Sequence, residues 1–88
     1  MNIRFKPLFF RQLKKITDKS LKVDVGQAIQ SVKKADENKD IPGLKKLKGY
    51  KIYYRIKVGD YRIGVTIEND LVTFVVFRHR KDIYKVFP

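Results

Sequence analysis

Residues 50–68, with the sequence YKIYYRIKVGDYRIGVTIE, decide the fold of this chain. Apolar and polar side chains alternate on either side of Gly59 and Asp60, which is the pattern of two half-buried strands over residues 50–58 and 61–68. Glycine at the first of two loop positions suits a type II′ turn. The stretch therefore predicts an antiparallel β-hairpin in which Val58 pairs with Tyr61.

This register sorts the hairpin side chains onto two faces, because successive residues of a strand point to opposite sides. One face is apolar and is expected to be covered by helices. It collects Ile52, Tyr54, Ile56, Val58, Tyr61, Ile63, Val65 and Ile67. The other face is largely polar and collects Lys51, Tyr53, Arg55, Lys57, Arg62, Gly64, Thr66 and Glu68.

The polar face is expected to bind an anion. Lys57 would lie opposite Arg62, and like charges placed opposite each other disfavour folding unless a ligand compensates. The alternative is that these long side chains extend into solvent. Gly64, opposite Arg55, leaves a gap that we expect to let a ligand approach the backbone. Lys51 is expected to form a favourable pair with Glu68.

The remaining pattern predicts an α+β domain spanning residues 1–88. Residues 2–6 alternate as a short N-terminal strand, and two apolar stripes at helical spacing follow, from Pro7 and from Leu21, as a helical hairpin. Residues 36–43 form a polar connector. Residues 71–77 form a third strand of the antiparallel meander, apolar on both faces, so that periodicity does not fix its register. The meander and the short strand are expected to form one sheet.

Composition narrows the function. The chain has 21 basic and nine acidic residues among 88, and its net charge of +12 favours polyanionic partners: nucleic acid, an anionic membrane or an acidic protein. A merely solvated surface is the alternative. Cysteine is absent and histidine occurs once, so we expect no disulfide, metal site or cofactor. Without a transmembrane stretch or signal peptide, the expected location is the cytoplasm.

Residues 78–84, with the sequence RHRKDIY, carry the groups of a phosphate site. Guanidinium, imidazole and phenol side chains bind a phosphate and move protons. The third strand is expected to end alongside the start of the 61–68 strand. Residues 78–84 would then emerge next to Arg62 and complete one site with it.

Three segments give the sequence a resemblance to the RelE/ParE superfamily of bacterial toxin–antitoxin systems. They are residues 44–50 (LKKLKGY), 54–62 (YRIKVGDYR) and 77–84 (FRHRKDIY). The resemblance implies the RelE/ParE fold and the toxin of a type II system. RelE-like members are mRNA endoribonucleases that act in the A site of the 70S ribosome, and an acidic antitoxin neutralises them.

The resemblance also implies site residues. Arg55 and Lys57 match the paired basic positions of the family, and Arg62 matches its phosphate-binding arginine. Arg80 matches the second arginine, and Tyr84 the C-terminal tyrosine.

The general base stays open between two residues. Metal-free RNA cleavage uses the 2′-OH as nucleophile, which requires a base, an acid and cations for the phosphorane. Lys57 is one candidate base because neighbouring cations favour release of its proton. His79 is the other base or acid candidate, because histidine ordinarily titrates near neutral pH. Tyr84 is expected to stack on a nucleobase or assist proton transfer.

Residues expected to bind RNA or the ribosome without catalysis are Lys51, Arg78 and Lys81. Two alternative functions remain open. One is a ParE-like inhibitor of DNA gyrase, and the other is a basic RNA-binding module without catalysis. The antitoxin is expected to add a strand or helix and to cover the cationic face with acidic side chains.

Overall fold

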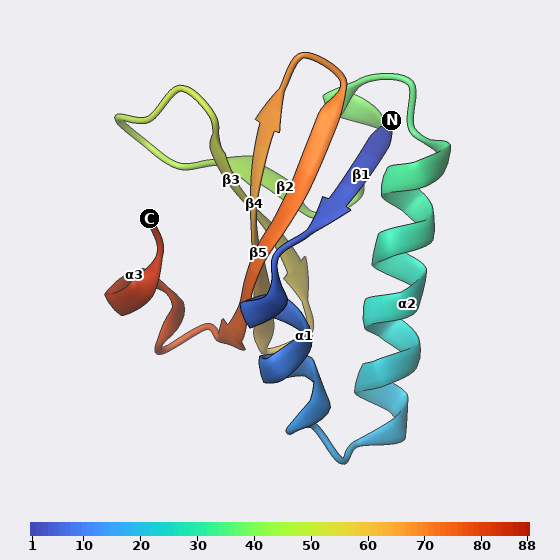
Figure 1. Ribbon diagram of the computed structural model, residues 1–88, viewed down its shortest axis with the longest axis vertical. Helices are drawn as coiled ribbons and strands as arrows, with labels where there is room; N and C mark the ends of the chain where they lie inside the picture. Colours follow the sequence, from blue (N-terminus) through green and yellow to red (C-terminus); the bar gives the residue numbers. More distant parts are fainter.

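The computed structural model describes residues 1–88 as a five-stranded sheet with three α-helices (Figure 1). The elements are β1 (Asn2–Phe5), α1 (Pro7–Lys14), α2 (Lys19–Lys34), a 3-10 helix (Asn38–Asp40), β2 (Leu44–Lys46), β3 (Tyr53–Val58), β4 (Tyr61–Glu68), β5 (Leu71–His79) and α3 (Ile83–Val86). The strand order is β1-β5-β4-β3-β2, and only the β1–β5 pair is parallel. The predicted α+β class is confirmed. None of the helices combines the length and the apolar character needed to cross a bilayer.

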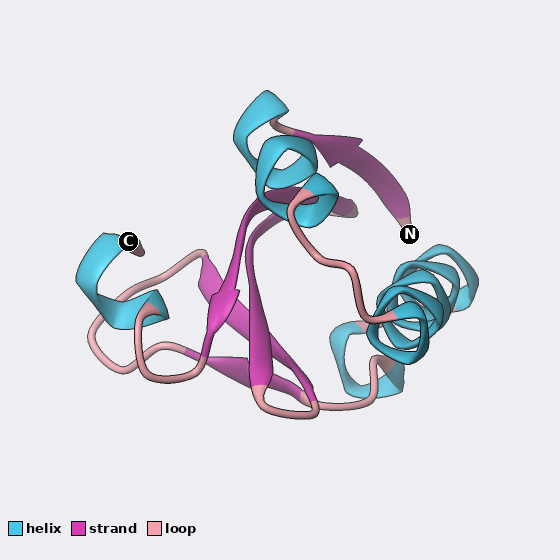
Figure 2. Ribbon diagram, turned by 90° about the horizontal axis from the view of Figure 1, so that it is seen from below, coloured by secondary structure: helices cyan, strands magenta, loops and turns pink.

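Helices lie on both sides of the sheet (Figure 2). The helices α1 and α2 pack on the apolar face that the hairpin register predicted, and Phe9 and Val25 are buried there against Ile56 and Ile63. The helix α2 begins after Asp18, whose side chain caps it by accepting a hydrogen bond from the backbone N–H of Leu21 at 3.2 Å. The short C-terminal helix α3 lies on the opposite side of the sheet.

The predicted hairpin register is confirmed, from Val58 opposite Tyr61 to Arg55 opposite Gly64. Gly59 has a φ of 59°, the left-handed conformation that the first position of the turn requires. The predicted strand over residues 50–58 is too long, because β3 begins only at Tyr53. The chain before it turns at Gly49, whose φ is 86°. The strand β2 and the helix α3 were not predicted.

A β-bulge in β5 explains why that strand is apolar on both faces. Gly64 pairs with Val76 and Val65 with Phe74, so Val75 is an extra residue without an opposite partner. The bulge puts Phe74 and Phe77, three positions apart, on the same helix-covered face. Beyond the bulge, the alternation of β5 is reversed relative to its first half.

Candidate functional site

Three cations form a row across adjacent strands at one end of the sheet. Lys57 of β3 lies opposite Arg62 of β4, and Arg62 lies opposite Arg78 of β5. Directly opposite side chains have Cβ atoms about 4.5–5.5 Å apart. The row faces away from α1 and α2, because the neighbouring positions Ile56 and Ile63 are buried under these helices. This cationic row (Lys57, Arg62, Arg78) contains no carboxylate and concentrates positive charge on the open face.

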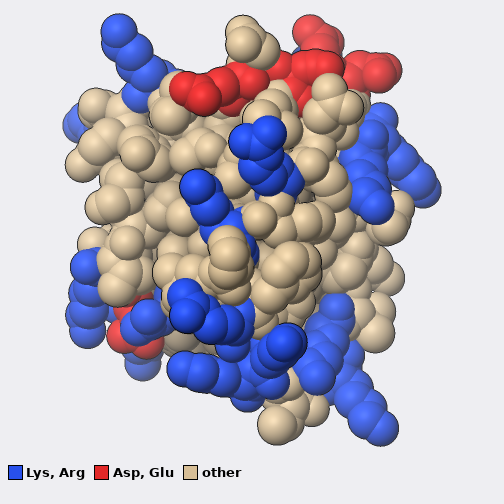
Figure 3. Space-filling view, viewed as in Figure 1, with Lys and Arg blue, Asp and Glu red and all other residues tan.

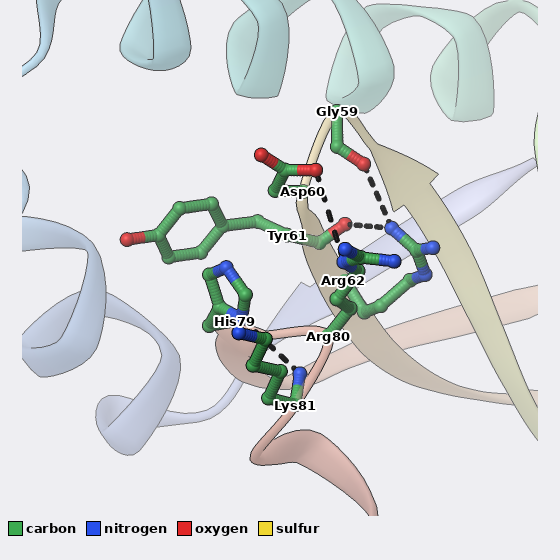
Figure 4. A network of polar contacts seen from close by, with 7 residues as sticks. All are labelled: Gly59, Asp60, Tyr61, Arg62, His79, Arg80 and Lys81. Atoms are coloured by element: carbon green, nitrogen blue, oxygen red, sulfur yellow. Dashed lines mark hydrogen bonds and ion pairs between the residues drawn. The ribbon is translucent and has the colours of Figure 1, made fainter.

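Two arginines reach the β3–β4 turn beside this row (Figure 4). Arg62 Nη1 donates to the carbonyl oxygens of Gly59 and Tyr61, each at 2.8 Å. Arg80 donates its backbone N–H to the carbonyl of Asp60 at 2.8 Å, and its Nε lies 3.8 Å from Asp60 Oδ1. Both partners of that ion pair are exposed, so it adds little stability. The guanidinium of Arg80 therefore lies at the same end of the sheet as the cationic row.

The structure separates His79 from these arginines. His79 pairs with Tyr61, one position along from the Arg62–Arg78 pair, so both side chains point to the helix-covered side. The ring of His79 meets Tyr61 edge-on at 5.3 Å, and Tyr61 stacks on buried Phe77 at 5.1 Å. His79 Nδ1 accepts the backbone N–H of Lys81 at 3.1 Å. Segment 78–84 therefore does not present all its groups to one site.

A cleft of about 570 Å³ lies on the same face of the sheet, and its lining residue Arg55 is two positions before Lys57 of the cationic row on β3. Its walls are the segment around β2, the strand β3 and the C-terminal segment, and its charged side chains are all cations. Its basic and aromatic lining side chains are Lys45, Lys46, Lys48, Arg55, Tyr50, Tyr84 and Phe87, and we call this site the aromatic cleft. Arg55 is held in place by a 2.6 Å hydrogen bond from its Nη1 to the carbonyl of Gly43. Tyr84, from α3, is 59% exposed at this cleft.

The expected gap at Gly64 is filled by the protein itself. A Cβ atom at Gly64 would lie 2.7 Å from Val76 Cγ2 and 2.8 Å from Phe87 Cδ2. Phe87 is 2% exposed and forms a small second core with Val76 and Ile83 on the open side of the sheet. The expectation that a ligand approaches the backbone at Gly64 is therefore wrong. Glycine is needed there because the ring of Phe87 packs directly on the strand.

The other expected contacts lie at the edges of this region. Lys51 is exposed just before β3 and forms no ion pair with Glu68, which corrects that expectation. Lys81 is exposed beyond the end of β5. Sequence reasoning did not assign Lys45, Lys46 or Tyr50 to a site. The signal that could have identified them is the Lys-rich segment that ends in a glycine turn. No three His, Asp or Glu side chains come together as metal ligands.

The charge of the molecule is unevenly distributed. Figure 3 shows acidic side chains gathered at the end of the molecule where the N-terminus lies, whereas basic side chains are spread over this face and are densest toward the opposite end. Asp70 lies at the acidic end, where it accepts a hydrogen bond from the Asn2 side chain. The cationic row lies at the other end of the strands, next to the β3–β4 turn. A polyanion is therefore attracted to that end of the sheet.

Matches to known proteins cover nearly the whole chain. A family model described as the ParE toxin of the type II toxin-antitoxin system parDE matches residues 3–84. Toxin RelE3 of Methanocaldococcus jannaschii is 38% identical over 91 residues, covering 100% of each chain.

Solved structures show the same fold. The RelB-RelE antitoxin-toxin complex from Methanococcus jannaschii contains a chain with a TM-score of 0.80 and 33% identity, covering 97% of this chain and 99% of that one. The YoeB dimer from Staphylococcus aureus gives a TM-score of 0.71 at 20% identity, covering 90% and 95%.

Proposed function

Because the chain belongs to the RelE/ParE superfamily of type II toxins, we propose that it is an endoribonuclease that cleaves mRNA in the A site of the translating ribosome. The observation that carries this proposal is the cationic row next to the aromatic cleft. The row supplies fixed positive charge for a phosphate. The cleft supplies exposed aromatic rings and further cations for the adjoining nucleotides.

The chemistry proposed is transesterification by the RNA itself. Lys57 takes the proton of the 2′-OH, and the 2′ oxygen attacks the adjacent phosphorus. The bond from phosphorus to the 5′ oxygen breaks, which leaves a 2′,3′-cyclic phosphate and a 5′-OH. Arg62 and Arg78 stabilise the charge of the phosphorane, since arginine stays protonated and presents several donors. Tyr84 is the candidate donor of the proton that the 5′ oxygen needs.

Lys57 is preferred to His79 as the base because of the faces on which the two side chains lie. Lys57 is exposed within the cationic row. His79 projects to the helix-covered side, whereas the strand register places Arg62 and Arg78 on the opposite face; Arg78 and His79 also both line a groove beside α1. Arg80 remains a candidate phosphate ligand through its place beside the turn. Arg55 is a candidate for binding the adjoining phosphate.

The proposed partners are an acidic antitoxin, the mRNA and the ribosome. The RelB-RelE complex shows that a related toxin is held by an antitoxin. For this chain, an acidic antitoxin segment over the cationic row would neutralise the like charges of three adjacent strands. Such a segment would both stabilise the toxin and keep RNA away from the row.

Mapping of RNA 5′ ends on translating ribosomes tests the proposal. The wild type is compared with Arg62→Gln/Arg78→Gln, which removes two charges from the row. The matched control is Lys19→Gln/Lys22→Gln, which removes two charges from exposed positions of α2. We expect new 5′-OH ends within codons, paired with 2′,3′-cyclic phosphates, for the wild type and the control only.

A different result would overturn the nuclease proposal. Growth arrest without new RNA ends, accompanied by breaks in gyrase-bound DNA, would indicate the gyrase inhibitor that is the alternative function. Equal cleavage by the row variant and the control would show that the cationic row is not the catalytic site.

A further inference from the structure

We propose that Tyr50 is a nucleobase-binding residue, and that the aromatic cleft holds the base next to the cleaved bond. This inference rests on the proposed function and extends it to how the substrate is held. Tyr50 is 47% exposed and lines the same cleft as Tyr84 of the C-terminal segment. An exposed aromatic ring beside several cations suits single-stranded RNA, where the ring stacks on a base and the cations follow the backbone.

The position of Tyr50 is fixed by local structure. Its backbone N–H donates to the carbonyl of Leu47 at 3.2 Å, which closes a tight turn. Gly49, the third residue of this turn, has a φ of 86°, a conformation that glycine adopts without strain. The turn therefore presents the ring of Tyr50 at a defined place before any RNA binds.

Tyr50 packs against a row of aromatic rings, the aromatic ladder of Tyr53 and Phe87, which connects it to the sheet. Tyr50 meets Tyr53 edge-on, with ring centroids 5.5 Å apart, and Tyr53 meets Phe87 edge-on at 5.4 Å. Phe87 is buried over Gly64 on the sheet. The ladder leaves the Tyr50 side chain partly exposed while it restrains the ring, which lowers the entropic cost of stacking.

The size and charge of the cleft fit a nucleotide. Its volume of about 570 Å³ lies within the range of small-ligand sites. Four basic side chains and no acidic side chain line it, so the cleft favours an anionic backbone over a cationic ligand. A protein partner would not require an open aromatic ring next to these cations, whereas single-stranded RNA uses both features.

Tryptophan fluorescence tests the proposal directly, because the protein contains no tryptophan. Tyr50→Trp places a single reporter in the cleft. Phe10→Trp, at an exposed position of α1, is the matched control. The probe is a short single-stranded RNA with 2′-O-methyl groups, which lacks the nucleophile and is not cleaved. Inorganic polyphosphate serves as a polyanion without bases.

We expect the methylated RNA to quench the fluorescence of the Tyr50→Trp variant saturably, whereas polyphosphate leaves it unchanged. The Phe10→Trp control should show no quenching with either probe. We also expect Tyr50→Ala to weaken RNA binding by about 5- to 100-fold, and Tyr50→Phe to retain it, since stacking needs the ring and not the hydroxyl. Unfolding curves of these variants establish that each is folded.

Two sets of results would overturn the inference. One is unchanged fluorescence of the Tyr50→Trp variant when the RNA is added. The other is quenching without specificity: the RNA quenches the Tyr50→Trp and Phe10→Trp variants equally, or RNA and polyphosphate quench the Tyr50→Trp variant equally. Such quenching would show charge attraction without stacking. If the wild type still cleaves mRNA on translating ribosomes, either result would contradict only the base-binding inference and not the proposed function. Specific quenching of the Tyr50→Trp variant without any cleavage by the wild type would support the base-binding cleft and contradict the nuclease.

Discussion

Replacing Gly64 with alanine is expected to lower the free energy of unfolding by about 1–2 kcal/mol. The new Cβ would lie 2.7 Å from Val76 Cγ2, and 2.8 and 2.9 Å from two ring carbons of Phe87. Overpacking of this kind costs about 1–3 kcal/mol, while the loss of glycine's freedom in the unfolded chain returns about 0.4–1 kcal/mol. The steric clash is expected to outweigh this gain because Val76 and Phe87 are both buried.

Urea unfolding of four proteins checks this prediction: the wild type, Gly64→Ala, Phe87→Leu and the double variant. Phe87→Leu alone is expected to cost about 1–2 kcal/mol through lost burial. In the double variant the smaller leucine side chain makes room for the new methyl group. Alanine at position 64 is therefore expected to cost less on that background than in the wild type, with the remaining cost coming from the contact with Val76. In thermal unfolding, the single Gly64→Ala change should lower Tm by about 10 °C.

Additivity would refute the reasoning. If Gly64→Ala costs the same with phenylalanine or leucine at position 87, the ring of Phe87 does not pack on Gly64. An increase in stability on Gly64→Ala would show the same more strongly, since an open site would gain from alanine. The denaturant slope m should stay constant across the set, because all four proteins expose similar surface on unfolding.

Three further predictions concern the site and the helices. Arg78→Gln is expected to lower the rate of mRNA cleavage by about 10²-fold, whereas His79→Gln should leave that rate unchanged. Single-turnover kinetics on translating ribosomes measure both rates, and a larger loss of rate for His79→Gln than for Arg78→Gln would contradict the assignment of faces. Asp18→Ala should cost about 1 kcal/mol of stability by removing the cap on Leu21, whereas Asp18→Asn should retain most of it; equal losses in urea unfolding would argue against the cap. Lys57→Gln should reduce the dependence of log Kd on log salt by about 0.7 for single-stranded RNA, and an unchanged slope in a salt titration would place Lys57 outside the RNA contact.

Much of the fold could be predicted because its signals are local. Alternation of apolar and polar residues, with Gly59 at the turn, correctly predicted every pair from Arg55–Gly64 to Val58–Tyr61. Short elements were missed, because β2 has three residues and α3 has four, and neither is long enough to show a period.

The site was predicted in part. The cross-strand pairing of Lys57 with Arg62 followed from the two-residue turn at Gly59 and Asp60, so the sequence determined that these cations share one face. The partner of Arg62 on β5 did not follow, since β5 is apolar on both faces and a shift of one residue exchanges the faces of a strand. The bulge at Val75 makes that choice, bringing Arg78 to the cationic row and taking His79 to the side of α1 and α2.

By itself, then, the sequence determined the helical hairpin, the hairpin of β3 and β4, the positive charge and the motifs of the superfamily, because each depends on residues close together in the chain. Only the tertiary structure decided which face His79 takes and that Phe87 fills the gap at Gly64. It also decided that Tyr50 and Tyr84 line one cleft. These features depend on contacts between segments far apart in the chain, or on a bulge. The local periodicity of the sequence predicts neither long-range contacts nor bulges.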